Sequence, residues 1–184
     1  YSSQKDYEKA IKFYDKAIEL GRVHNKTKLV NSSIQEKMGL FIRQNRLEEA
    51  QNLVKTLNHQ MLNNQANLTI GRLYYRLNQP DSAYYYLNRA IKSDNIYTQQ
   101  SAYQALFYLS RKQKDYEKNA EYSVKLWKIN DSINKIDRNK ALIEMQEKYN
   151  EQRVRDELTT QMLLQKQRTW TFIGIGVLVL LFVA

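Results

Sequence analysis

The chain has 184 residues, of which 42% are hydrophobic and 26% are charged, and it contains five glycines, one proline and no cysteine. So few glycines and prolines are typical of an all-helical protein, and no segment alternates apolar and polar residues for long enough to predict a sheet. The absence of cysteine excludes a disulfide framework, a thiolate zinc site and a cysteine nucleophile.

The formal net charge is +10, and nearly all of the excess lies in one part of the chain. Residues 1–129 hold 21 lysines and arginines against 12 aspartates and glutamates, whereas residues 130–184 hold 8 against 7. The basic residues are scattered singly and form no known nucleic-acid-binding motif, so a nucleic acid partner is not favoured.

Apolar residues recur at helical spacing through the first 129 residues. They predict one helix over 5–20 and then three helix pairs, over 29–44 and 47–60, 66–77 and 80–92, and 97–112 and 115–129. Gly21 is expected to stop the first helix, followed by a polar loop over 22–28. Pro80 is expected to begin a helix because its missing N–H needs no partner in the first turn.

The middle helix pair carries the clearest packing pattern. Gly71 and Tyr74 lie three residues apart on its first helix, and Ala83, Leu87 and Ala90 recur on its second, so that small residues on one helix meet large ones on the other. The second-helix pattern recurs as Ala10-x3-Tyr14-x2-Ala17 and as Ala50-x3-Val54-x2-Leu57. The tetrapeptide Asp6-Tyr7-Glu8-Lys9 returns as Asp115-Tyr116-Glu117-Lys118.

This spacing resembles the tetratricopeptide repeat, a pair of helices that recurs every ~34 residues. The resemblance covers residues 5–129 and implies one half repeat and three whole ones, stacked as an α-solenoid. Met38, Asn119 and Ser123 depart from the pattern in the second and fourth units. The first helix of the half repeat would precede Tyr1, and no initiator methionine is present, so the chain is expected to be a fragment or a processed form.

Stacked repeats of this family form a concave groove lined by the first helix of each pair, and the resemblance implies that a protein or peptide partner binds there. The matching positions in this chain are Gln35, Arg43, Leu68, Arg72, Arg76, Gln104, Tyr108, Arg111 and Lys112. Such a groove would be basic and would favour an acidic partner, unless the arginines form an ordinary solvated face. The carboxylate clamp of cochaperones does not carry over, because Gly39, Leu68 and Gln104 stand at its positions.

Residues 131–168 contain neither glycine nor proline and predict one long charged helix, with Asn130-Asp131-Ser132 as its cap. Acidic residues precede basic ones by four positions at Glu151 and Arg155 and at similar pairs, which stabilises a helix in water. Ile133, Ile136 and Ile143 are expected to cap the last repeat, and the remainder is expected to project as a stalk. A weak coiled coil that joins two copies is the alternative, because charged residues interrupt the heptad pattern.

Residues 169–184 carry no charge and are interpreted as a truncated transmembrane helix, since sixteen residues span only ~24 Å as a helix. The expected membrane anchors are Trp170, Phe172, Ile173, Leu178 and Leu181. The expected domains are therefore a repeat domain over 1–129, a long helix over 130–168 and the membrane segment over 169–184.

This order of parts resembles bacterial membrane-anchored sensory regulators. The resemblance implies a single-pass membrane protein with an extracytoplasmic, periplasmic repeat domain, in which partner binding signals to a missing output domain, such as a transcriptional regulator. The alternative is a tail-anchored cytoplasmic scaffold that assembles partners at a membrane. Lys166 and Arg168 on the repeat side favour this second orientation by the positive-inside rule.

Enzymatic activity is not expected. His24 and His59 lie far apart in the sequence, and no phosphate-binding loop, nucleophile elbow or metal-binding motif is present. No cofactor and no metal are therefore predicted.

Overall fold

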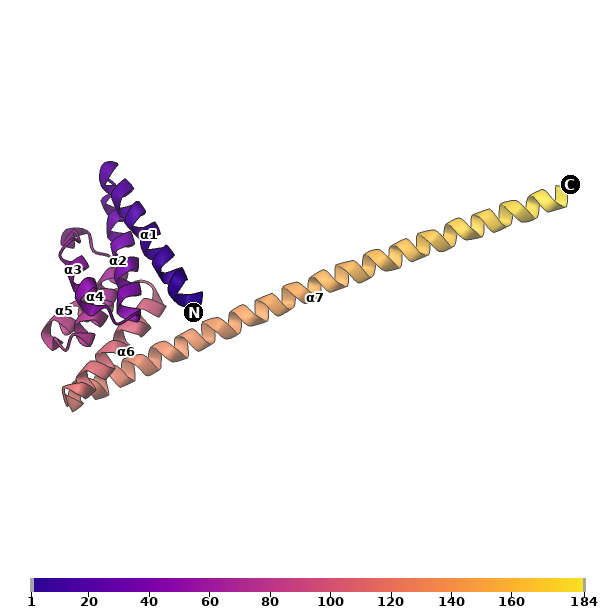
Figure 1. The fold of residues 1–184 in the computed structure, drawn as a ribbon. Helices are drawn as coiled ribbons and strands as arrows, with labels where there is room; N and C mark the ends of the chain where they lie inside the picture. Colours follow the sequence, from indigo (N-terminus) through magenta and orange to yellow (C-terminus); the bar gives the residue numbers. More distant parts are fainter. Residues whose placement is uncertain (1, 184) are drawn as a thin grey trace. The chain divides into compact units, whose positions relative to one another are not determined.

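The computed structural model describes the backbone of residues 2–183 and the side chains of residues 6–176. This part of the chain is all-helical, with seven α-helices, one short 3-10 helix and no strand, which confirms the predicted all-α class (Figure 1). The elements are α1 (Ser2–Val23), α2 (Thr27–Arg43), α3 (Leu47–Val54), η1 (His59–Met61), α4 (Asn64–Arg76), α5 (Pro80–Ala90), α6 (Ile96–Lys112) and α7 (Tyr116–Val183).

Four tight turns share one geometry. In each turn a residue adopts the left-handed conformation: Asn25 with a φ of 54°, Asn45 with 62°, Asn78 with 57° and Lys114 with 58°. The next residue then donates its N–H to a carbonyl five positions earlier, as in Lys26 to Gly21 at 2.7 Å, which satisfies a carbonyl at the end of the preceding helix. Asparagine tolerates this conformation better than most residues, and so three of the four positions suit the turn.

The prediction that Gly21 stops the first helix is wrong. α1 continues to Val23, and Asn25 makes the turn instead. Gly21 is buried in the helix because α2 passes close to it: a Cβ atom on Gly21 would lie 2.8 Å from Cγ2 of Val30. The glycine therefore permits close packing of two helices.

Helix α3 is shorter than predicted. It ends at Val54 instead of residue 60, and the chain continues through η1 before α4 begins. The Asn31 side chain of α2 fixes this connection, because its Nδ2 donates to the Asn58 carbonyl at 3.0 Å and its Oδ1 accepts from the Asn58 N–H at 3.1 Å. The connection is therefore an ordered segment that packs on α2.

Two clusters of buried apolar side chains form the core of the repeats. Helices α4 and α5 approach each other closely at Gly71, because a Cβ atom there would lie 2.7 Å from Cγ of the buried Leu87. Ala83 and Ala90 are fully buried on α5, and the Tyr74 and Tyr86 rings stack with centroids 5.6 Å apart. This confirms the packing predicted from the spacing of small and large residues.

Helix α7 is a single helix where two were expected. At the start of α7 the Lys118 N–H donates to Asp115 Oδ1 at 3.1 Å. The cap expected at residues 130–132 is wrong, because these residues lie inside α7 and the Ser132 hydroxyl donates to the Lys128 carbonyl. The chain divides into two compact units, Tyr1–Ile133 and Asn134–Ala184. Ile133 is buried within the first of these units.

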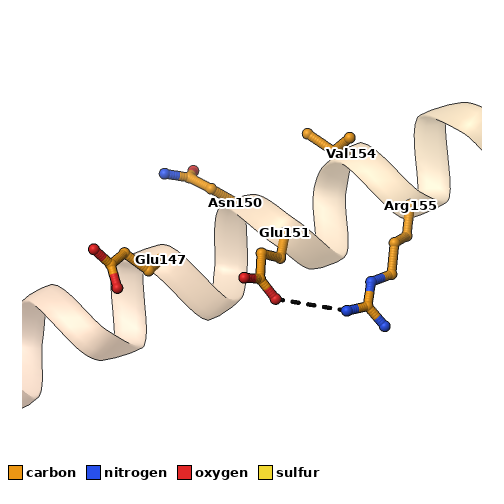
Figure 2. A pocket seen from close by; sticks show the side chains of 5 residues that line it. All are labelled: Glu147, Asn150, Glu151, Val154 and Arg155. Atoms are coloured by element: carbon orange, nitrogen blue, oxygen red, sulfur yellow. Dashed lines mark ion pairs between the residues drawn. The ribbon is translucent and has the colours of Figure 1, made fainter.

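Every described side chain from residue 134 to residue 176 is exposed. Oppositely charged residues four positions apart pair along the helix, including Glu151 and Arg155 with Oε2 and Nη2 3.5 Å apart, as Figure 2 shows. The labelled residues of Figure 2 line a hollow, but all of them belong to α7, so no second element closes it into a site.

The predictions of a transmembrane helix and of a membrane location are wrong. Within the described residues, none of the helices combines the length and the apolar character that a membrane crossing requires. The uncharged run follows directly on Lys166 and Arg168 in the same helix, α7, so the described residues offer no apolar helix of the length that a ~30 Å hydrocarbon core requires. Of the expected anchors, Trp170, Phe172 and Ile173 are exposed, and the Leu178 and Leu181 side chains lie outside the described residues.

Candidate partner-binding face of the repeats

Helices α2, α4 and α6 lie side by side in the repeat domain. α4 packs against both α2 and α6, and among the described residues no comparable approach joins α3 to α5. Because each of these three helices is followed by a partner that reverses the chain, all three run in the same direction. Their carboxyl-terminal ends therefore gather at one edge of the domain and their amino-terminal ends at the opposite edge.

These three helices carry almost exclusively positive charge. Together they carry seven lysines and arginines and a single acidic residue, Glu36. Lys37 pairs with Asp15 of α1 across 2.5 Å. Within the part of the chain that the structure describes, no ion pair links a carboxylate to the other six, which are Lys28, Arg43, Arg72, Arg76, Arg111 and Lys112.

Four of these cations stand in the last turns of their helices, at the carboxyl-terminal edge: Arg43, Arg76, Arg111 and Lys112. All four are exposed. Arg76 Nη2 donates to Asn45 Oδ1 at 2.8 Å, and Lys112 Nζ lies 5.5 Å from the centre of the Tyr75 ring. These neutral contacts orient the cations without neutralising them, and the negative end of each helix dipole stabilises them there.

Arg72 lies one turn before Arg76 on α4 and differs from it in its surroundings. Burial lowers the pKa of the Arg72 guanidinium, although more than a third of the residue remains accessible to solvent. A partly desolvated guanidinium without a carboxylate partner is unfavourable unless an anion approaches it. An anion that approached the Arg72 guanidinium would offset this cost.

The structure places the remaining expected groove residues in two settings. Gln104 and Tyr108 are exposed on α6, and the Tyr108 ring contacts the Phe107 ring edge to face at 5.4 Å. Leu68 is only 2% exposed and belongs to the core with Leu87. Gln35 is 5% exposed and lines a cavity between α2 and α4. Seven of the nine expected residues are thus accessible, while Leu68 serves packing.

Two cavities at the amino-terminal edge were not anticipated. One, of about 300 Å³, is lined by residues that include Lys28, Gln35, Met61 and Asn63, and the other, of about 600 Å³, also contacts Lys28 and Met61. Met61 belongs to the η1 segment, which the sequence pattern assigns to a helix. The polar run Asn58-His59-Gln60 is the one sequence signal for an interruption at this place.

The histidines do not form a site with one another. His59 Nε2 lies 3.1 Å from the Val54 carbonyl, which is a structural contact, and His24 is exposed at the end of α1. Among the described residues, no group of three or more histidine, aspartate and glutamate side chains could hold a metal ion.

The tetratricopeptide repeat family model matches the chain over residues 1–22 and 65–97. The second range corresponds to α4 and α5, where Gly71 and the buried alanines follow the repeat pattern. The fourth unit lies outside the match, and there Asn119 replaces the expected alanine and donates to the Phe107 carbonyl at 2.8 Å.

No curated protein and no solved structure matches the chain significantly. The resemblance to membrane-anchored sensory regulators is not shown by these comparisons. The two family-model matches and the all-helical fold support a tetratricopeptide repeat protein, a class that suggests a module for protein–protein interaction.

Proposed function

We propose that this chain binds an acidic segment of a partner protein across the face formed by α2, α4 and α6. The observation that carries the proposal is the set of six cations on these helices that have no carboxylate partner in the described chain, beside a single acidic residue. Helices on the opposite side carry the acidic residues of the same repeats, such as Glu48, Glu49 and Asp81.

The interaction would rest on charge-assisted hydrogen bonds. Arginine presents a planar fork of donors that matches a carboxylate, and the partly buried Arg72 has already lost part of its hydration. Arg76 and the cations at the ends of α2 and α6 extend the positive potential along the edge. An acidic chain would therefore be attracted along the face and held most firmly at Arg72.

The test compares two charge reversals of equal size. Arg72→Glu with Arg76→Glu changes the proposed face, and Lys12→Glu with Lys16→Glu changes exposed lysines of α1 by the same four charge units. The probe is a fluorescein-labelled peptide of alternating glutamate and serine, and its control has glutamine in place of glutamate. Binding is followed by fluorescence anisotropy, and circular dichroism checks that the helical content is unchanged.

We expect the Arg72 and Arg76 variant to bind the glutamate peptide about tenfold more weakly or worse, since each charge-assisted hydrogen bond contributes ~1.5–3 kcal/mol. The Lys12 and Lys16 variant should lose much less affinity for the glutamate peptide. The glutamine peptide should bind poorly to the unmodified protein and to both variants. Equal losses in the two variants would mean that only the overall charge attracts the peptide, and the proposal would then be wrong. Tighter binding of a single-stranded oligonucleotide than of the peptide would also overturn it.

A further inference from the structure

The η1 segment creates a surface at the amino-terminal edge of α2 and α4, opposite the edge that carries Arg43, Arg76 and Arg111. Lys28 and Met61 line two of the cavities at this edge, so these two cavities share a wall. Met61 is 45% exposed and Leu29, in the larger cavity, is 48% exposed. Two accessible apolar side chains thus border the same hollow.

The charge around this hollow has one sign. Lys26 and Lys28 line the larger cavity, Lys28 and the buried Gln35 line the smaller one, and no acidic residue lines either. Neither lysine forms an ion pair within the described chain. Lys26 is the N-cap residue of α2, and its side chain makes no capping hydrogen bond. The positive end of the dipole of α2 therefore lies beside the same cavity, without a side-chain acceptor from Lys26.

Hydrogen bonds from two residues that line the smaller cavity, Asn31 and Asn63, hold the segment in place. Asn31 makes its reciprocal bonds to Asn58, and the Asn63 side chain accepts from the Ala66 N–H at 2.7 Å to begin α4. Anchored on both sides, Met61 stays beside Lys28 rather than folding onto the core. The surface is therefore built before a partner arrives, which lowers the entropic cost of binding.

We infer that this surface, which we call the Met61 site and define by Lys26, Lys28, Leu29, Met61 and Gln35, binds an apolar side chain of a partner peptide next to an acidic residue. The apolar side chain contacts Met61 and Leu29, and the carboxylate contacts Lys26 and Lys28. Charge complementarity selects this partner, because two lysines beside an apolar hollow without acidic neighbours favour a carboxylate on the incoming chain. The larger cavity, at about 600 Å³, is the one that Met61 and Leu29 both line, and it has room for a large apolar side chain.

The Met61 site shares Lys28 with the six cations of the face formed by α2, α4 and α6, which we call the Arg72 face, but it lies at the edge opposite Arg76. The two can therefore be tested separately with two labelled peptides. One peptide alternates glutamate with leucine and the other alternates glutamate with serine, so only the first offers apolar side chains. Met61→Ser removes the apolar wall on an exposed residue, and Met145→Ser, at a side chain that is 71% exposed on α7, is the matched control. Circular dichroism confirms that each variant remains folded.

We expect Met61→Ser to weaken binding of the glutamate–leucine peptide at least fivefold, to leave the glutamate–serine peptide unchanged within twofold, and Met145→Ser to change neither. Equal binding of the glutamate–leucine peptide by Met61→Ser and the unmodified protein would overturn the Met61 site and leave the Arg72 face standing. Conversely, Met61→Ser could weaken binding of the glutamate–leucine peptide while Arg72→Glu with Arg76→Glu weakens binding of neither peptide. That result would retain the Met61 site and overturn the Arg72 face.

Methyl NMR of the unmodified chain gives a second measurement that needs no substitution. The chain has four methionines, of which Met38 is fully buried while Met145 and Met162 are exposed on α7. Titration with the glutamate–leucine peptide should shift the Met61 methyl resonance and leave those of Met145 and Met162 in place. A shift at Met145 or Met162 with none at Met61 would contradict the inference.

Discussion

The repeat domain, Tyr1–Ile133, and the helix that continues through Asn134 are both helical, but for different physical reasons. In the repeats, apolar side chains such as Ile70, Leu87 and Leu106 are fully buried between neighbouring helices. From residue 134 to residue 176 every described side chain is exposed, and ion pairs four positions apart are the contacts that recur along the helix. Exposed pairs of this kind contribute only ~0.3–0.5 kcal/mol each.

The comparison teaches that helical content and stability have separate sources in this molecule. A helix without a packed face depends on propensity and local pairs, and nucleation makes it marginal when isolated. The repeats instead lose stability when one well-packed residue changes. Substitutions in the two regions should consequently differ in size, and the following experiments test that difference.

The largest expected effect comes from truncating a core side chain. Leu106→Ala should lower the free energy of unfolding by ~2–5 kcal/mol, because it removes buried surface and leaves a cavity. Leu142→Ala, at a side chain that is 64% exposed on α7, should change it by less than about 0.5 kcal/mol. Urea unfolding followed by circular dichroism measures both. Comparable losses in the two variants would mean that the long helix is packed as firmly as the repeats.

A second pair of variants tests close packing between helices. Gly71→Ala should lower stability by ~1–3 kcal/mol, because the new Cβ would lie 2.7 Å from Leu87 Cγ and 3.1 Å from its backbone nitrogen. Gly39→Ala on α2 should instead raise stability by ~0.5–1 kcal/mol, since its Cβ meets only the end of Arg43 at 3.9 Å and alanine favours a helix. Thermal unfolding of both variants gives the sign of each change, and a stabilising Gly71→Ala would refute the packing described here.

The turn between α6 and α7 offers a smaller effect in the opposite direction. Lys114 has a φ of 58°, which strains a residue with a Cβ atom, so Lys114→Gly should raise the free energy of unfolding by ~0.5–1 kcal/mol. Asn78→Gly, in the equivalent turn after α4, should change it less, because asparagine already accepts this conformation. Calorimetry on the two variants and the unmodified protein compares the turns directly.

The smallest expected effect depends on pH. The Lys118 side chain, and then its backbone N–H, donate to Asp115 and hold the pKa of that carboxyl below its usual value. Asp115 therefore stabilises the fold above the pKa of the unfolded chain, and this contribution disappears as the pH falls through the lowered folded pKa. Asp115→Asn keeps a side-chain oxygen for the cap but removes the titration. Its unfolding midpoint should decrease less than that of the unmodified protein between pH 6 and pH 3.

Much of the repeat domain follows from its sequence because the signals agree with one another. Gly71, Ala83 and Ala90 predict the α4–α5 pair, and Pro80 predicts where α5 begins; both expectations are confirmed. Helix ends were harder to predict. Asn130-Asp131-Ser132 has the composition of a cap, yet the buried Ile133 keeps the chain helical, so tertiary packing prevails over a local preference.

The candidate site was less accessible to prediction, because spacing indicates which way a residue faces but not how deeply it is covered. Leu68 and Arg76 lie two turns apart on α4, and only Arg76 is exposed. The Met61 site depends on η1, whose course is set by hydrogen bonds from Asn31, 27 residues before Asn58. A contact over that separation leaves no periodic pattern in the sequence. The membrane interpretation rested on the uncharged run after Arg168, and it is wrong because no helix of the described residues is both long and apolar enough to cross a membrane.

The amide of Asn31 has a consequence for how this molecule could change. The Asn31 side chain bonds to both the N–H and the carbonyl of Asn58, as a neighbouring β-strand would. Both bonds use main-chain atoms, so they do not depend on which side chain residue 58 carries. The Met61 side chain takes part in neither bond and is 45% exposed. Substitutions at Met61 could therefore change which partner binds while the packing of the helices stays the same.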